Sequence, residues 1–260
     1  MHTLANGLTI IAQGNPSAQP LVFIHGFPFD QTLWDGVIGE LKEHYYCISY
    51  DVRGLGSSEV GHGQYTMEGY VDDLEAVLLH LNLDQPVVCG FSMGGYIALR
   101  ASERLQCFKA LILANTTATS DNNEAKLKRA SALKKIDKEG VASFLEGFFA
   151  VAFSKQYQQN HNDTLVHWKE KILSFDPIGI KGALLAMISR TDTTGSLNQA
   201  PPTLFIEASK DEIIPTGTMK KLAKTVKNAH YVELQRSGHM SMLEHPQAFI
   251  NSVQTFLRDV

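Results

Sequence analysis

The 260-residue sequence lacks any long apolar run, so it contains no candidate for a membrane-spanning helix. Its longest apolar runs reach about eight residues, whereas a helix that crosses a bilayer needs about 20. The first residues, Met1 to Gly7, also lack the basic segment and the apolar core of a signal peptide. We therefore predict a cytoplasmic protein that makes no contact with a membrane.

Cysteine is scarce, and its spacing does not match a structural framework. Cys47, Cys89 and Cys107 are an odd number of thiols without the spacing of a disulfide set or a zinc site. We expect all three to be small, buried, apolar side chains. The sequence predicts no metal site and no cofactor.

Clusters of basic residues are absent, and the formal net charge is only −4. Nucleic acid is therefore not an expected partner. The glycine-rich segment Asp51–Ser58 lacks the lysine and the spacing of a phosphate-binding loop. Within it, we expect Asp51 and Arg53 to form a structural ion pair. A small molecule remains as the expected partner, and the sequence gives no indication of the oligomeric state.

Apolar strand-like runs alternate with amphipathic helical segments along most of the chain. This alternation predicts an α/β fold, in which a mainly parallel sheet is flanked by helices. An Asn6-Gly7 turn predicts a small antiparallel hairpin between 2–5 and 8–12. The other expected strands are 21–24, 46–50, 86–90, 110–114, 203–206 and 230–234, and the expected helices are 30–43, 66–81, 93–104, 215–227 and 246–257.

The region 117–192 breaks the alternation, because it contains no strand-like run. Its expected helices are 124–138, 140–153, 164–175 and 177–190. Helices inserted after the sixth strand, above the strand ends, are typical of a lid. We therefore predict a core formed by 1–116 and 193–260 and a small helical lid formed by 117–192.

Four apolar side chains are candidates for the wall of a substrate pocket: Trp34, Phe148, Met187 and Met240. For Trp34 we favour core packing over a place in the pocket, and lid residues such as Phe148 can instead form the core of the lid itself. Arg190, near the end of the lid, could bind a substrate carboxylate or serve as a structural ion-pair partner.

The segment Gly90-Phe91-Ser92-Met93-Gly94-Gly95 stands between a predicted strand and a predicted helix. A strand, a sharp glycine-flanked turn and a helix are the context that a G-x-S-x-G nucleophile motif requires. The N–H of Met93 would lie at the helix N-terminus, where a developing negative charge is stabilised. The alternative is a glycine-rich turn that carries an inert serine.

A serine nucleophile needs a base, and the base needs an acid that fixes its tautomer. Asp211 and His239 follow predicted strands, as Ser92 does, and the chain order is Ser, Asp, His. Rivals for the acid are Glu212, Glu207 and Asp192, and His245 is a rival for the base. A second oxyanion donor is expected in the loop after 21–24, where we select the N–H of Phe27; His25 is expected to orient this loop.

Together these segments resemble the serine hydrolases of the α/β-hydrolase family. The matching stretches are HGFP at 25–28, D-x-R-G-x-G-x-S at 51–58, GFSMGG at 90–95, SKDEIIP at 209–215 and SGHMSMLEHP at 237–246. The resemblance implies a catalytic triad of Ser92, Asp211 and His239. It also implies an oxyanion hole formed by the N–H groups of Phe27 and Met93.

Within that family, the lid and the segment 187–192 are most similar to the oxoadipate enol-lactonase-like carboxylesterases. Epoxide hydrolases and haloalkane dehalogenases share HGFP-like loops, but they carry an aspartate where Ser92 stands. The expected function is the hydrolysis of a small ester, lactone or thioester through an acyl-enzyme on Ser92. Two alternatives are a cofactor-free perhydrolase or haloperoxidase-like activity with the same triad, and a small-ligand sensor with vestigial hydrolysis.

Overall fold

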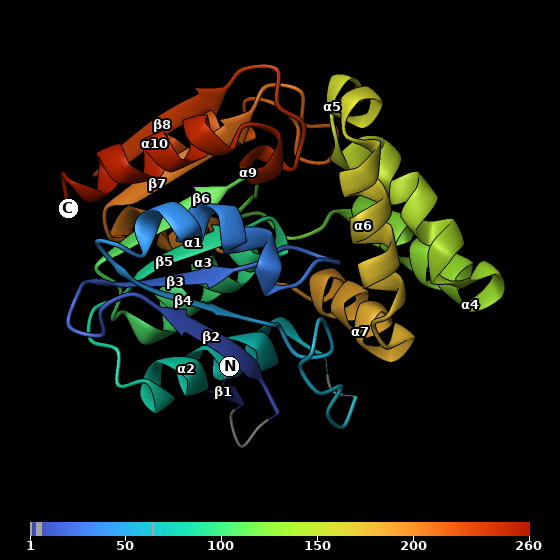
Figure 1. Cartoon of the computed structure of the whole chain (residues 1–260), viewed down its shortest axis with the longest axis horizontal. Helices are drawn as coiled ribbons and strands as arrows, with labels where there is room; N and C mark the ends of the chain where they lie inside the picture. Colours follow the sequence, from blue (N-terminus) through green and yellow to red (C-terminus); the bar gives the residue numbers. More distant parts are fainter. Residues whose placement is uncertain (1, 4–6, 64) are drawn as a thin grey trace.

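A computed structural model describes residues 2–3, 7–63 and 65–260 of the chain. Within these residues the strands form one eight-stranded sheet in the order β1-β2-β4-β3-β5-β6-β7-β8 (Figure 1). The strands are β1 (His2–Thr3), β2 (Thr9–Gln13), β3 (Pro20–Ile24), β4 (Tyr46–Tyr50), β5 (Val87–Phe91), β6 (Ala110–Ala114), β7 (Thr203–Ala208) and β8 (Ala229–Leu234).

The sheet is parallel except at one edge. Strand β2 pairs antiparallel with β1 and β4, and every other neighbouring pair from β4 to β8 is parallel. This confirms the predicted α/β fold with its mainly parallel sheet. The antiparallel hairpin is also confirmed by the pairing of His2 with Ile10, although Asn6 of its predicted turn lies outside the described residues.

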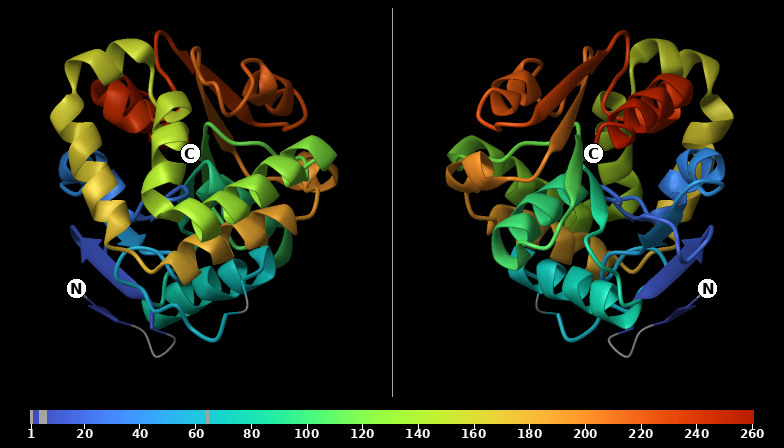
Figure 2. Two further views of the ribbon diagram at one scale, coloured as in Figure 1. Left: turned by 90° about the vertical axis from the view of Figure 1, so that its right-hand side faces the viewer. Right: turned by 90° about the vertical axis from the view of Figure 1, so that its left-hand side faces the viewer.

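Helices cover both faces of the sheet. Helices α1 (Asp35–Leu41) and α10 (Pro246–Leu257) pack together on one face, and α2 (Met67–His80) and α3 (Met93–Leu105) pack together on the other (Figures 1 and 2). The continuous apolar runs of the central strands follow from this arrangement, because strands covered on both faces have no solvent-facing side. All five residues of β5 and of β6 are buried.

Short helices complete the core. They are η1 (Gln31–Trp34), η2 (Thr194–Gln199), α8 (Thr218–Ala223) and α9 (Ser241–Glu244). The helix predicted at 215–227 is therefore shorter than expected, because Gly217, with φ of 89°, stands immediately before it. Among the described residues, no helix is long and apolar enough to cross a membrane.

Four α-helices stand between β6 and β7, before η2, and gather at one end of the sheet (Figure 1). They are α4 (Asn123–Ala152), α5 (Lys155–Asn160), α6 (Asn162–Leu173) and α7 (Pro177–Ile188). Helix α4 is interrupted at Gly140, whose φ of 83° and ψ of 168° are not helical, and this break separates the two helices predicted there. The short helix α5 was not predicted. We call these four helices the insertion.

Aromatic side chains join the insertion to the loop after β3. Phe27 lies 5.8 Å from Phe144 and 6.1 Å from Phe148 between ring centroids, and Phe29 lies 5.0 Å from Trp168. An ion pair adds to this contact, because Lys171 Nζ of α6 lies 2.8 Å from the buried carboxylate of Asp30. The insertion therefore packs on the end of the sheet where the parallel strands terminate.

Two expectations about side chains are wrong. Asp51 does not pair with Arg53: its carboxylate accepts hydrogen bonds from the N–H groups of Gln31 and Ser57, both at 2.8 Å. Arg53 instead reaches helix α2 and pairs with Asp73 at 2.5 Å. Cys47 and Cys89 are buried as expected, but Cys107 is exposed, because it lies in the turn that follows α3 rather than in a strand.

Glycine at position 94 is required by a close approach of helix α3 to strand β3. A Cβ added there would meet the carbonyl oxygens of Ile24 and His25, whereas one added at Gly36 in α1 would meet no atom within 4 Å. We expect Gly94→Ala to lower the free energy of unfolding by about 2 kcal/mol or more. Gly36→Ala, the matched control, should raise it by about 0.5–1 kcal/mol.

Urea unfolding of both variants measures this difference. Similar stability changes in the two variants would show that space at Gly94 is not limiting.

Candidate active site

Ser92 occupies a strained turn between β5 and α3. Its φ of 51° and ψ of −114° lie outside the regions that most side-chain-bearing residues adopt, which costs of order 1–3 kcal/mol. Two hydrogen bonds hold this backbone in place: the Ser92 N–H donates to Ala114 O at 3.0 Å, and the Thr116 hydroxyl donates to Ser92 O at 2.8 Å. The strained residue is therefore the serine that the motif selects.

His239 and Asp211 form a buried pair. His239 Nδ1 lies 2.7 Å from Asp211 Oδ2, and the two side chains are each 2% exposed. Because a carboxylate only accepts hydrogen bonds, Nδ1 carries the hydrogen and Nε2 is left with a free lone pair. The other carboxylate oxygen, Oδ1, accepts from the N–H groups of Ile213 and Ile214 at 2.8 and 2.9 Å, so the acid is fixed as well.

The structure brings the histidine pair to the serine turn. The His239 ring packs against the ring of Phe91, the residue before Ser92, with centroids 4.9 Å apart. On the other side, Asn115 donates from Nδ2 to His239 O at 2.5 Å. Asn115 and its neighbour Thr116, which bonds to Ser92, thus connect the two loops.

Sequence reasoning missed Asn115 and Thr116. They directly follow β6, so a search for polar residues at every strand end would have found them.

Phe27 lies in the loop after β3, and Met93 lies at the start of α3, which closely approaches the end of β3. Met93 is the first residue of α3, where backbone N–H groups have no partner inside the helix. Among the hydrogen bonds of the described residues, the N–H of Phe27 has no acceptor, while Phe29 N–H closes the turn by donating to Gly26 O at 3.0 Å. Gly94 packs beneath this loop, which keeps it close to the start of α3.

His25 supports the same loop from below. Its Nδ1 lies 3.1 Å from Gly26 O, and its Nε2 accepts from the Val52 N–H at 2.9 Å, so both ring nitrogens are in use. Complete burial lowers the pKa of His25 to about 4, which keeps it neutral. Burial has the opposite effect on the nearby carboxyl group of Asp51 and raises its pKa to about 6.

Geometry separates Asp211 from its rivals. Glu212 is exposed, and the buried Glu207 is used by the Met219 N–H and the Tyr231 hydroxyl. Asp192 is also exposed and accepts from the Thr194 N–H at 2.8 Å. None of these three hydrogen bonds reaches His239.

The structure corrects the candidate assignment of Trp34 to the wall of a substrate pocket. It is fully buried, with its ring 5.3 Å from Phe23 and 6.0 Å from Phe249, so it belongs to the core between the sheet and α10. Phe148 packs against Phe27 and stays a candidate. Met240 is fully buried beside His239, and Met187 is 2% exposed.

Arg190 is the partner of a structural ion pair. It pairs with Asp121 at 2.5 Å and stacks at 4.0 Å on the ring of Tyr96. Its Nη2 also donates to Thr119 O at 2.8 Å. These contacts use the guanidinium within the protein, so we do not propose it as a carboxylate binder.

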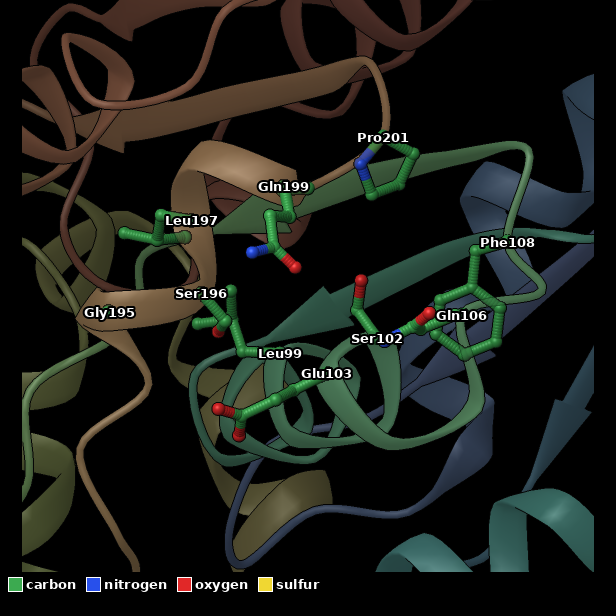
Figure 3. A pocket seen from close by; sticks show the side chains of 11 residues that line it. Leu99, Ser102, Glu103, Gln106, Phe108, Gly195, Ser196, Leu197, Gln199 and Pro201 are labelled. Atoms are coloured by element: carbon green, nitrogen blue, oxygen red, sulfur yellow. The ribbon is translucent and has the colours of Figure 1, made fainter.

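A groove with a volume of about 530 Å³ lies elsewhere, between α3 and η2 (Figure 3). Its lining includes Ser102, which lies ten residues after Ser92 and hence about 15 Å further along the helix axis. The groove is therefore separate from the serine turn. No group of three or more potential metal-ligating side chains occurs in the described part of the chain.

Comparisons with known proteins agree with the α/β fold described above. Residues 19–246 match the family described as the alpha/beta hydrolase fold. A 3-oxoadipate enol-lactonase of Acinetobacter baylyi is 24% identical over 94% of this chain and 91% of its own length. A thermophilic esterase of Thermogutta terrifontis, solved with malate bound, superimposes with a TM-score of 0.92 at 31% identity and covers 97% of this chain and 93% of its own.

The enol-lactonase of Burkholderia xenovorans superimposes with a TM-score of 0.89 at 25% identity, with 96% of each chain covered. The relatives thus include enzymes that cleave esters and enol-lactones.

The lowered pKa of His25 predicts how the stability of the protein depends on pH. The unfolded chain binds a proton at His25 below about 6.5, but the folded chain does not until about 4, so wild type loses stability as the pH falls through this window. We expect His25→Asn to lower the free energy of unfolding most near neutral pH. Asparagine binds no proton, so the variant does not lose stability as the pH falls in the way that wild type does. The gap to wild type should shrink by up to about 3 kcal/mol near pH 4.

Urea unfolding of both proteins at the two pH values measures the gap. A gap that stays constant would mean that His25 titrates normally in the fold.

Proposed function

Because this chain belongs to the alpha/beta hydrolase family, we propose that it is a serine hydrolase that cleaves a small carboxylic ester, lactone or thioester. The observation that carries the proposal is the buried His239–Asp211 pair at 2.7 Å, packed beside the strained turn of Ser92. In this proposal Ser92 is the nucleophile, His239 the base and Asp211 the acid.

In the proposed first step, Ser92 Oγ attacks the substrate carbonyl while His239 Nε2 takes the hydroxyl proton. Asp211 holds the imidazole in the tautomer that leaves Nε2 free and stabilises the imidazolium that forms. The N–H groups of Phe27 and Met93 receive the developing oxyanion, and each such donor is typically worth about 10²–10³ in turnover. His239 then protonates the leaving alcohol or thiol, or the enolate in the case of an enol-lactone.

In the proposed second step, water hydrolyses the acyl-enzyme. His239 removes a proton from the water, and the tetrahedral intermediate collapses to release the acid and regenerate Ser92. The same two N–H groups stabilise this second oxyanion. The residues assigned here supply every proton transfer in both steps.

We further propose that the insertion acts as a lid over this site. Its Phe144 and Phe148 pack on Phe27, the residue that supplies one oxyanion donor. Phe148, Met187 and Met240 would then form part of the substrate-binding wall. The esterase and enol-lactonase relatives favour a small substrate with an ester or lactone bond.

The nucleophile is tested with Ser92→Ala and a serine-directed fluorophosphonate, read by intact mass. We expect wild type to hydrolyse short-chain p-nitrophenyl esters and to form one covalent adduct. Ser92→Ala should lose both, with turnover reduced by on the order of 10⁶. Ser102→Ala, on the helix that follows Ser92 but in the separate groove, is the matched control and should keep both.

Equal labelling of wild type and Ser92→Ala would refute the proposed nucleophile. A labelled Ser92 without ester turnover would instead favour the small-ligand sensor.

A second candidate is a peroxide-dependent activity with the same triad. A putative non-heme chloroperoxidase of Synechocystis is 30% identical over 82% of this chain and 82% of its own length. In such chemistry hydrogen peroxide takes the place of water, so the acyl-enzyme yields a peracid that oxidises halide. Bromination of a dye in acetate, bromide and peroxide, lost in Ser92→Ala, would support this candidate.

A further inference from the structure

Glu244, the last residue of α9, is half-buried and directs its carboxylate at two backbone donors. Oε2 accepts from the Gly238 N–H at 3.1 Å and from the Ser154 N–H at 3.2 Å, and Oε1 lies 3.3 Å from the same Ser154 nitrogen. Gly238 immediately precedes His239, and Ser154 stands between α4 and α5 of the insertion. One carboxylate therefore bonds to both the histidine loop and the insertion.

A direct contact reinforces this connection on the other side of the histidine. The N–H of Met240 donates to Ala152 O at 3.3 Å, at the end of α4. Gly238 is also pressed against the insertion, because a Cβ added there would meet the Ser154 nitrogen. Both neighbours of His239 in sequence are thus attached to the junction between α4 and α5.

The core holds His239 from the opposite direction. Asn115 donates to its carbonyl oxygen at 2.5 Å, and Asp211 accepts from its ring at 2.7 Å. The loop that carries His239 is therefore attached both to the core and to the insertion.

We propose that Glu244 is a positioning residue that joins the loop carrying His239 to the junction between α4 and α5. The base is aligned with Asp211 only when the insertion is seated. This inference rests on the proposed role of His239 as the base. It assigns Glu244 no contact with substrate, so its removal affects the rate of the chemical step rather than substrate binding.

Two variants break the connection from opposite ends. Glu244→Ala removes the acceptor, and Glu244→Gln keeps one acceptor oxygen. Ser154→Pro removes the donor without straining the chain, because Ser154 has φ of −60° and the preceding Phe153 is extended at φ −112° and ψ 145°. Ser154→Ala is its matched control, since it loses the same hydroxyl but keeps the N–H.

We expect Glu244→Ala and Ser154→Pro to lower kcat by about 10- to 100-fold, as small misplacements of a catalytic group do, with KM within about twofold of wild type. Fluorophosphonate labelling of Ser92 should slow in parallel, and the NMR signal of the His239 Nδ1 proton should shift or broaden. Glu244→Gln should recover part of the rate, and Ser154→Ala should stay near wild type. Glu146→Gln, on an exposed glutamate of α4, controls for charge.

Assays are run at a temperature where circular dichroism shows every variant folded. Lowered melting temperatures with unchanged kcat, labelling rate and Nδ1 signal would reduce Glu244 to a structural residue and overturn the inference. Failure of the proposed function would give a different result, because fluorophosphonate would then label wild type and Ser92→Ala to the same extent.

Discussion

The backbone of Ser92, held at a positive φ between β5 and α3, is the constraint on which the site depends. A turn this tight brings α3 directly under the end of β3, and only a residue without a side chain fits at Gly94. The end of β3, and with it the loop that carries Phe27, is then held beside the start of α3. The bond from Thr116 to Ser92 O fixes the loop after β6 to the same turn. The ends of β3, β5 and β6 are thus all held at the turn that contains Ser92.

The proposed acid and base, Asp211 and His239, follow strands beyond β6 in the sheet and need separate support. Asp211 and His239 follow β7 and β8, the last two strands in the sheet order, whereas Ser92 follows the central strand β5. A parallel sheet places all these ends at one edge but leaves lateral gaps between them. Asn115, at the end of the intervening β6, crosses that gap to the carbonyl of His239. The aromatic and ionic contacts of the insertion then cover the loops from above.

Features with a local signal could be predicted from the sequence, and features set by tertiary contacts could not. The sheet, the helix that starts after Thr66 and the break at Gly140 all follow from periodicity, capping residues and glycine. The partner of Arg53 could not be predicted, because Asp73 is brought to it by the packing of α2 against the loop after β4. Trp34 was ambiguous for the same reason, since its burial depends on Phe249 at the other end of the chain. Asn115 follows a predicted strand and Glu244 lies in the matching stretch 237–246, but the sequence does not show which backbone groups either side chain contacts.

The break at Gly140 divides α4 into two rods with different attachments. The rod before it is joined to α7 through Lys181 with Asp137 and through Arg129 with Met187, while the rod after it buries Val141, Leu145 and Phe149 against the core side. Gly140, with φ of 83° and ψ of 168°, interrupts the helical hydrogen-bond geometry between the two rods. Each rod is therefore fixed by its own side-chain contacts rather than by one continuous helix axis. Substitutions in the first rod can thus alter its contacts with α7 while the rod that contacts Phe27 keeps its own attachments.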